Sequence, residues 1–487
     1  MATAPTSPRF TAVTGVALSS ALAILLWAPG CGSGGSPTGP SATPSAPPAA
    51  VRGTVDATHA LRTVDSGRVL GGNLGAWVAP QALGGPTGSY VIERGARLLR
   101  FPGGNLSNSF CWLTMRASDK DLVKWDDWSW GTGVETYLSF VESVGGLPMY
   151  SLTPFDHVID GRTHSALEEA RELVRLLVSR GHRGAFYEVG NENDGSWNPM
   201  LSSAEYVERF VTFAEAVKRE DPQAQLMGPV GSGTDPAWRD GFIDGLADRR
   251  RLSLLDYFSF HYYGGWISNS NSAGIDLSAP QLIPGHVKAI RDRLAARGAP
   301  DTGVALTEYN AAIWDTGATR GQYTIEQGLW LADTAGELFG CIDLGDVWID
   351  LTGDDPHGML DSRSAPPSRT KNYWPMYLVA RTLGLGRRDD AVDVLAATTE
   401  LPTSRATIHA VRGSDGSLGV VLVNKGEALS ADLSLAGRPC SAATALLLDG
   451  NAYAAGTGPG PHTATCAGTT LTVDLPQLSA VGVVLAP

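Results

Sequence analysis

Eight short apolar runs alternate with helical stretches between residues 69 and 351, and this alternation constrains the fold more than any other feature of the chain. Each run has the length and composition of a buried strand. The runs lie at residues 69–74, 97–101, 148–152, 185–189, 225–228, 257–261, 304–307 and 347–351. Strands that alternate with helices build a parallel sheet, and eight such units close into one barrel. We therefore predict an α/β fold with a (β/α)₈ TIM barrel at residues 66–385.

The C-terminal part of the chain, residues 386–487, consists of short alternating runs separated by Gly, Ser and Asp. This pattern predicts an appended β-sandwich. A strand-like segment at residues 51–65 has no helical pattern behind it, and we expect it to join the sandwich. The sandwich is either a sugar-binding module or a buttress packed on the barrel.

Residues 1–31 have the composition of an export signal. Arg9 precedes an apolar segment that ends in small residues followed by Cys31, an order similar to that of a bacterial lipoprotein signal. Residues 32–50 are almost entirely Gly, Ser, Pro, Thr and Ala, and we expect a flexible tether. We predict an exported protein, lipid-anchored through Cys31 at the cell surface or in the periplasm, with simple secretion as the alternative. The membrane is then a partner only through this anchor.

Export places the four later cysteines in a compartment where disulfides form. Cys440 and Cys466 both fall in the all-β region, and we predict that they pair. Cys111 follows a barrel strand, whereas Cys341 follows a helix, so they are expected at opposite ends of the barrel and unpaired.

The net charge of −13 argues against binding to nucleic acid, because phosphate backbones require clusters of basic residues. A neutral oligo- or polysaccharide is not repelled by such a surface, and the 13 tryptophans suit stacking on sugar rings. No cofactor is expected. The His-x-His and His-Glu-x-x-His motifs that would indicate a metal-dependent hydrolase do not occur in the sequence. Asp354 and Asp355 after the eighth strand are either a Ca²⁺ ligand pair or a solvated loop.

Two glutamates close strand-like runs and open loops rich in Gly and Asn: Glu192 and Glu308. They lie 116 positions apart (308 − 192), about three strand–helix units at roughly 35–40 residues each. This spacing assigns them to strands four and seven, whose ends meet at the C-terminal face of the barrel. Retaining glycoside cleavage uses one carboxylic acid and one carboxylate nucleophile about 5–5.5 Å apart. We expect the ionised Glu308 to raise the pKa of Glu192.

The second strand carries Arg100 in the sequence Arg-Phe-Pro-Gly-Gly-Asn. An Arg beside a carboxylate keeps it ionised through charge-assisted hydrogen bonds. The turn that follows places Asn105 or Trp112 where either one faces the substrate.

Four motifs together resemble clan A retaining glycoside hydrolases, with family 51 α-L-arabinofuranosidases as the nearest match. They are residues 100–105 followed by Trp112, residues 190–192, residues 259–263 and residues 307–310. The resemblance implies that Glu308 is the nucleophile and Glu192 the acid/base, and that Asn191 reaches the sugar 2-hydroxyl.

The same resemblance implies roles for the end of strand six. His261 contacts the sugar or Glu192, and either Tyr263 or Tyr262 orients the nucleophile. Tryptophans on several loops are candidate stacking walls: Trp348, Trp77, Trp197, Trp266 and Trp314.

The chain departs from family 51 after strand one, where the family has a Glu that grips the furanose. Asn73 in this stretch is a neutral substitute, or its presence signals a different sugar, as in the endo-acting families 44, 39 and 30. These families cleave β-glucan, xyloglucan or xylan. A hypothesis of another class is an inactive carbohydrate-binding surface lipoprotein.

Overall fold

The computed structural model describes residues 49–118, 121–267, 274–314, 324–353 and 356–487. The export signal, Cys31, nearly all of the tether, the loop at residues 354–355, and the side chains of Trp266 and Trp314 lie outside the described residues. Within the described ranges, none of the helices is both long and apolar enough to cross a membrane.

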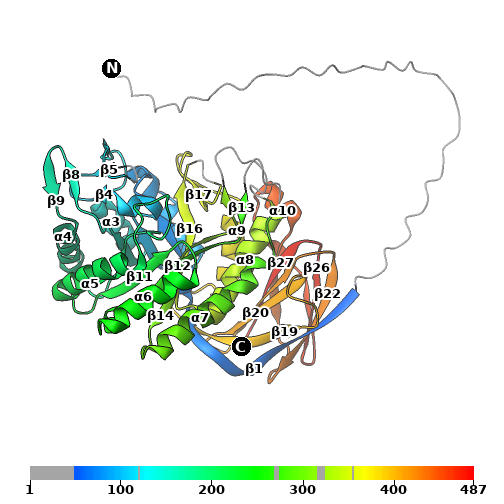
Figure 1. Ribbon diagram of the computed structural model, residues 1–487. Helices are drawn as coiled ribbons and strands as arrows, with labels where there is room; N and C mark the ends of the chain where they lie inside the picture. Colours follow the sequence, from blue (N-terminus) through cyan, green and yellow to red (C-terminus); the bar gives the residue numbers. More distant parts are fainter. Residues whose placement is uncertain (1–48, 119–120, 268–273, 315–323, 354–355) are drawn as a thin grey trace, which may run out of the picture. The chain divides into compact units, whose positions relative to one another are not determined.

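Eight parallel strands close into a barrel, as the alternation predicts (Figure 1). They are β2 (Gly71–Leu74), β3 (Leu98–Phe101), β7 (Leu147–Leu152), β10 (Phe186–Val189), β11 (Gln225–Gly231), β12 (Tyr257–Tyr263), β14 (Gly303–Asn310) and β16 (Leu344–Thr352). Closure is complete because β16 pairs with both β14 and β2.

One long helix follows each barrel strand. These helices are α2 (Thr87–Glu93), α3 (Val134–Ser143), α4 (Ala166–Ser179), α5 (Ser203–Glu220), α6 (Pro236–Asp248), α7 (Ile283–Ala296), α8 (Ile325–Cys341) and α9 (Tyr373–Thr382). Side-chain oxygens cap the starts of α4, α5 and α6, and on α5 Ser202 and Glu205 form a reciprocal capping box. The eight strand–helix units confirm the predicted fold class.

Two insertions lengthen the loops at the C-terminal face. A three-stranded sheet of β4 (Phe110–Cys111), β5 (Arg116–Ser118) and β6 (Trp125–Asp127) follows β3. The hairpin of β8 (His157–Ile159) and β9 (Arg162–His164) follows β7. Both insertions build up the rim of the barrel around its second and third strands.

The barrel interior is layered, because alternate residues of a strand share one face. An apolar layer comes from six strands: Leu98, Met149, Phe186, Met227, Ala305 and Leu344. Two residues farther along four of these strands, the side chains are buried and polar: Arg100, Ser151, Glu188 and Asp346. The polar layer forms the floor of the candidate site.

The remaining strands form a mostly antiparallel sheet with a core of its own. Its order is β24 (Gly460–His462), β23 (Ala443–Leu448), β27 (Ser479–Leu485), β21 (Leu418–Asn424), β20 (Ala406–Arg412), β19 (Ala391–Thr399), β1 (Ala49–Asp65), β22 (Leu429–Ala436), β26 (Thr470–Leu475) and β25 (Ala464–Ala467). The long β1 pairs with β22 on one side and β19 on the other, and so links the two halves of the sandwich.

A buried carboxylate provides one of the contacts that join the barrel to the sandwich. Asp333 on α8 accepts from Thr407 Oγ1 at 2.6 Å and pairs with His409 Nε2 at 2.8 Å and Lys425 Nζ at 2.6 Å. All three partners belong to the sandwich or the residue after β21. This contact favours a buttressing role for the sandwich.

Cys440 and Cys466 form a disulfide, whereas Cys111 in β4 and Cys341 at the end of α8 are free thiols.

Candidate active site

Arg100 is the hub of the site. It is fully buried, and its guanidinium donates to Glu308 Oε1 at 2.7 Å, Glu188 Oε2 at 2.6 Å and Asn191 Oδ1 at 2.7 Å. Burial alone would lower the pKa of Arg100, but the charges of Glu188 and Glu308 raise it. The site therefore contains a permanent buried cation beside two carboxylates.

Glu308 reaches this cation because β14 is irregular. Phe260 pairs with Leu306 whereas His261 pairs with Glu308, which leaves Thr307 as an extra residue on β14. Such a bulge reverses the alternation of side chains beyond it. Glu308 is thereby directed to the inner face, where Tyr263 donates to its Oε2 at 3.0 Å.

Glu192 lies in a tight turn after β10, with a φ of +47° that few residues other than glycine adopt. Its N–H donates to Val230 O on the next strand, which holds the turn in place. Trp197 Nε1 donates to Oε2 at 2.7 Å, and His261 Nδ1 lies 2.8 Å from Oε1. Both carboxylate oxygens are thus positioned by neighbouring side chains.

The electrostatics of Glu192 differ from our expectation. Burial would raise the pKa of Glu192, but the hydrogen bond and charge of His261, with help from Trp197 and Arg100, lower it. Burial would lower the pKa of His261, but the charge of Glu308 and the contact between His261 and Glu192 raise this pKa. The expectation of a raised Glu192 pKa is wrong for the free protein, because it weighed the charge of Glu308 and left out the hydrogen bond and charge of His261.

Glu192 and Glu308 face one another. One oxygen of each carboxylate and one nitrogen of His261 all lie within 4.8 Å of one another. Inverting glycosidases separate their carboxyl groups by about 6.5–9.5 Å, whereas retaining enzymes hold them about 5–5.5 Å apart. The short separation fits the retaining arrangement. The three groups are also close enough together to hold a cation. The Arg100 guanidinium already supplies a positive charge beside Glu308.

A chain of amides supports the turn that carries Glu192. Asn191 Nδ2 donates to Asn105 Oδ1, which also accepts from Asn198. Asn108 accepts from the Asn191 N–H and donates to its carbonyl. Asn191 is buried and bound on both ends of its amide, and Asn105 is exposed at the rim. The predicted pair Asn191 and Asn105 therefore lies together beside Glu192.

Tryptophans line parts of the rim. Trp348 packs against the loop after β3 so closely that a Cβ on Gly104 would lie 2.6 Å from its ring. The ring of Trp77 is 5.8 Å from that of Trp348. Trp197 is half exposed and borders a hollow of about 180 Å³ with Asn105 and Asn198. These rings offer flat faces of the kind that sugars stack on.

Three predicted contact residues do not face the site. Asn73 is fully buried, and its amide donates to Thr307 O and Val347 O while accepting from Arg100. It braces the floor of the site, and its full burial keeps it out of reach of a sugar. Trp112 donates from Nε1 to Glu169 O on α4 at 3.2 Å and is directed toward that helix. Tyr262 also turns away and donates to Ala279 O, which leaves Tyr263 as the partner of Glu308.

Glu188 is the residue that sequence analysis missed. It precedes Glu192 by four positions on β10, and its Oε2 accepts from both Arg100 and Ser151. Strand alternation could have predicted that Glu188 faces the barrel interior, because it lies two residues after the inward-facing Phe186.

The fold is similar to that of several solved glycoside hydrolases of families 44 and 51. Among solved structures, a Paenibacillus polymyxa xyloglucanase of family 44 has 16% sequence identity and a TM-score of 0.70, over 90% of this chain and 100% of that one. A family 51 α-L-arabinofuranosidase from Bifidobacterium longum has 17% identity and a TM-score of 0.69, over 91% and 100%. An α-L-arabinofuranosidase from Thermotoga maritima has 13% identity and a TM-score of 0.67, over 89% and 99%. The resemblance to clan A is confirmed at the level of the fold.

Sequence comparison gives a weaker match. The chain is 23% identical over 194 residues to an intracellular exo-α-(1→5)-L-arabinofuranosidase from Streptomyces lividans. The match covers 36% of this chain and 28% of that protein. No family model matches the chain.

Proposed function

We propose that the protein is a retaining glycoside hydrolase that acts on neutral plant cell-wall polysaccharide by double displacement. Glu308 is the nucleophile and Glu192 the acid/base. The observation that carries the proposal is the facing pair of carboxylates, one held by Arg100 and Tyr263 and the other by His261 and Trp197.

The groups around the two carboxylates support these two roles. Glu308 accepts hydrogen bonds from the Arg100 guanidinium and the Tyr263 phenol, which hold the carboxylate in place for attack on an anomeric carbon. Glu192 shares its environment with a titratable imidazole, so the pair can exchange a proton with a leaving oxygen. When Glu308 becomes esterified, its charge disappears and Glu192 can act as base on water.

The sugar is the finer part of the proposal. An α-L-arabinofuranosidase-like activity follows from the sequence resemblance and from the match to the Streptomyces protein. A second candidate is an endo-acting glucanase, xyloglucanase or xylanase, and it is favoured by the burial of Asn73 under the site. A panel of arabinosyl, xylosyl and glucosyl aryl glycosides, with arabinan, xylan, xyloglucan and β-glucan, separates the two candidates.

Covalent trapping tests the mechanism. An activated 2-fluoroglycoside of the preferred sugar should label the wild-type protein on the peptide that contains Glu308. The Glu308→Gln variant should take no label and lose roughly 10⁴-fold or more in kcat, as removal of a nucleophile does. Glu326→Gln on α8 is the matched control. Hydrolysis with inversion, or a label on another peptide, would contradict the assignment.

We also propose export and lipid attachment at Cys31. Mass spectrometry of the N-terminal peptide should find a diacylglyceryl group on Cys31, and a Cys31→Ala variant should be released from membranes. An unmodified Cys31 in a membrane-free protein would favour simple secretion.

A further inference from the structure

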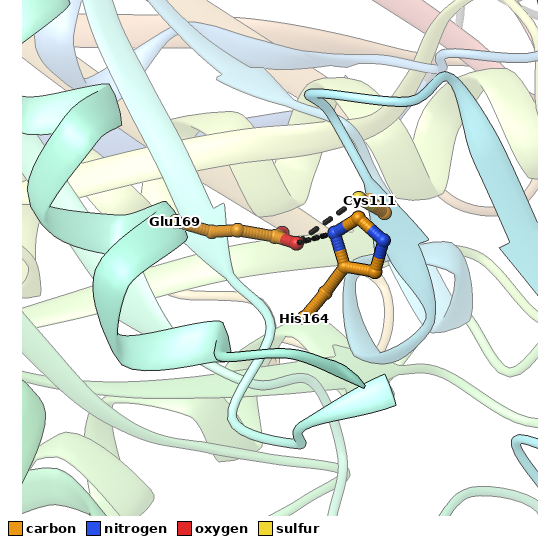
Figure 2. Close-up of side chains that lie close together, drawn as sticks. All are labelled: Cys111, His164 and Glu169. Carbon is orange, nitrogen blue, oxygen red and sulfur yellow. Dashed lines mark hydrogen bonds and ion pairs between the residues drawn. The ribbon is translucent and has the colours of Figure 1, made fainter. Parts of the chain in front are cut away.

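A second cluster of chemically active side chains lies away from the carboxylate pair. Cys111 in β4, His164 at the end of β9 and Glu169 on α4 converge at the rim of the barrel (Figure 2). The Cys111 thiol donates to Glu169 Oε1 at 3.0 Å, and His164 Nδ1 lies 3.7 Å from the same oxygen. One potential ligand atom from each residue lies within 4.8 Å of the other two.

We propose that Cys111, His164 and Glu169 form a binding site for one Zn²⁺-class divalent ion. A sulfur, an imidazole nitrogen and a carboxylate oxygen are the ligands that Zn²⁺ takes. Bonds of about 2.0–2.3 Å at tetrahedral angles separate such ligand atoms by roughly 3.3–3.7 Å. The thiol and the imidazole lie 3.0 and 3.7 Å from Glu169 Oε1, so these distances require shifts of only about a few tenths of an ångström.

The surroundings of Glu169 point to a cation. Its side chain is only 3% exposed, and within the described ranges no lysine or arginine forms an ion pair with it. A buried carboxylate is costly unless it is paired or coordinates a metal. Its Oε2 is buried and has no hydrogen-bond partner among the described residues, so a second ligand atom is available.

His157 completes the arrangement from the adjacent strand. It is fully buried, its Nε2 lies 3.1 Å from Glu169 Oε1, and its ring packs on Trp125. A hydrogen-bond partner of this kind fixes the orientation of a ligating carboxylate. His164, by contrast, is 23% exposed, which leaves a path for an ion from solvent.

The bound ion would connect three separate pieces of the rim. It would tie β4 to the β8–β9 hairpin and to α4. β4 begins two residues after Asn108, which holds both backbone groups of Asn191 beside Glu192. The ion would therefore cross-link the rim of the barrel next to the amides that support the turn carrying Glu192. This inference does not depend on the proposed enzymatic activity.

Metal counting on the untagged full chain tests the site. The protein is stripped with a chelator, dialysed and titrated with Zn²⁺, and bound metal is measured by plasma mass spectrometry. Wild type should retain one equivalent, and Zn²⁺ should restore the melting temperature that chelation lowers. Cys111→Ala and His164→Ala should lose the bound ion, and His157→Ala should bind it roughly 10–100-fold more weakly. Glu172→Gln on the same helix, Cys341→Ala and His462→Ala are matched controls that should bind as wild type.

Cobalt separates this site from the other groups that could hold a cation. Co²⁺ bound by a thiolate gives a sulfur-to-metal charge-transfer band, and neither the catalytic carboxylates nor the Asp333 cluster contains a cysteine. The band should appear in wild type, Cys341→Ala and Cys31→Ala and vanish in Cys111→Ala. A wild-type protein without the band, or zinc uptake that is equal in wild type and Cys111→Ala, overturns the proposal. The wild-type measurement decides the question even if the Cys111 variant fails to fold.

Discussion

His261 is fully buried, and its Nδ1 lies 2.8 Å from Oε1 of the partly buried Glu192, so the protonation of one group affects that of the other. The contact with His261 lowers the pKa of Glu192, whereas the charge of Glu308, followed by the contact with Glu192, raises the pKa of His261. Between these two pKa values the pair holds a single proton. The proton that a leaving group receives is therefore held jointly by Glu192 and His261.

The first prediction concerns the basic limb of the pH profile of kcat/KM. Because the pKa of His261 is raised, the pair loses its last proton above the ordinary histidine value of about 6.5. In His261→Gln only Glu192 can hold that proton, and we expect the limb to move to lower pH. His462→Gln in the sandwich should leave the limb in place. An unchanged limb in His261→Gln would show that the two groups are not coupled.

The second prediction concerns Glu192→Ala. Substrates with very acidic leaving groups barely need protonation, so they should still glycosylate Glu308. Breakdown of the intermediate then lacks its general base, and azide, which needs none, should restore release as a glycosyl azide. Chromatography and NMR of the product provide the measurement. Equal loss of rate for all leaving groups, without azide rescue, would remove Glu192 from the acid/base role.

The limits of sequence analysis are visible in β14. Its apolar run predicts a strand that ends near Glu308, but strict alternation would place Leu306 and Glu308 on the same outward face. The bulge at Thr307 reverses this order, and nothing in the local composition announces a bulge. The role of Glu308 was reachable only through the motif resemblance.

The neighbouring β12 shows a different limit. The apolar run predicts an end at residue 261, whereas the strand continues to Tyr263. Alternation from His261 then directs Tyr263 inward and Tyr262 outward. The sequence left the choice between the two tyrosines open because it did not show that the strand extends two residues further.

The cluster of Cys111, His164 and Glu169 escapes a motif search for another reason. Its members come from three elements, and the thiol is 53 positions from the imidazole (164 − 111). Only the folding of both rim insertions brings them together. The short, polar strands of these insertions also lack the apolar runs that reveal the barrel strands.

The third prediction tests the buried charges around Arg100. Arg100→Met leaves Glu188 and Glu308 buried without their cation, which should destabilise the protein by about 3–5 kcal/mol. Adding Glu188→Gln removes one of the stranded charges and should restore part of that loss. Arg291→Met, which breaks a half-exposed pair with Asp343, should cost only about 0–1 kcal/mol. Urea unfolding of wild type, the three single variants Arg100→Met, Glu188→Gln and Arg291→Met, and the double variant measures the differences, and additive losses in the double variant would contradict the coupling.

The fourth prediction concerns Asp346 in the polar layer of the barrel. Its two carboxylate oxygens have no hydrogen-bond partner among the described residues. Burial raises its pKa well above the ordinary value, and the charge of Arg100 only partly opposes this. Asp346 is therefore protonated in the folded state at pH values where the unfolded chain has already ionised it.

The effect of this difference in protonation on the stability of the protein has a definite sign. The folded state binds more protons than the unfolded state, so the contribution of Asp346 to stability falls as pH rises above the unfolded pKa of about 3.9. Asp346→Asn replaces the neutral acid by an amide of the same shape that never ionises. The variant should melt at a higher temperature than wild type at pH 7, and the difference should shrink as pH falls toward 4. Asp474→Asn, an exposed position on β26, should show no such trend, and a lower melting temperature of Asp346→Asn at pH 7 would mean that the ionised carboxylate is stabilised by the barrel.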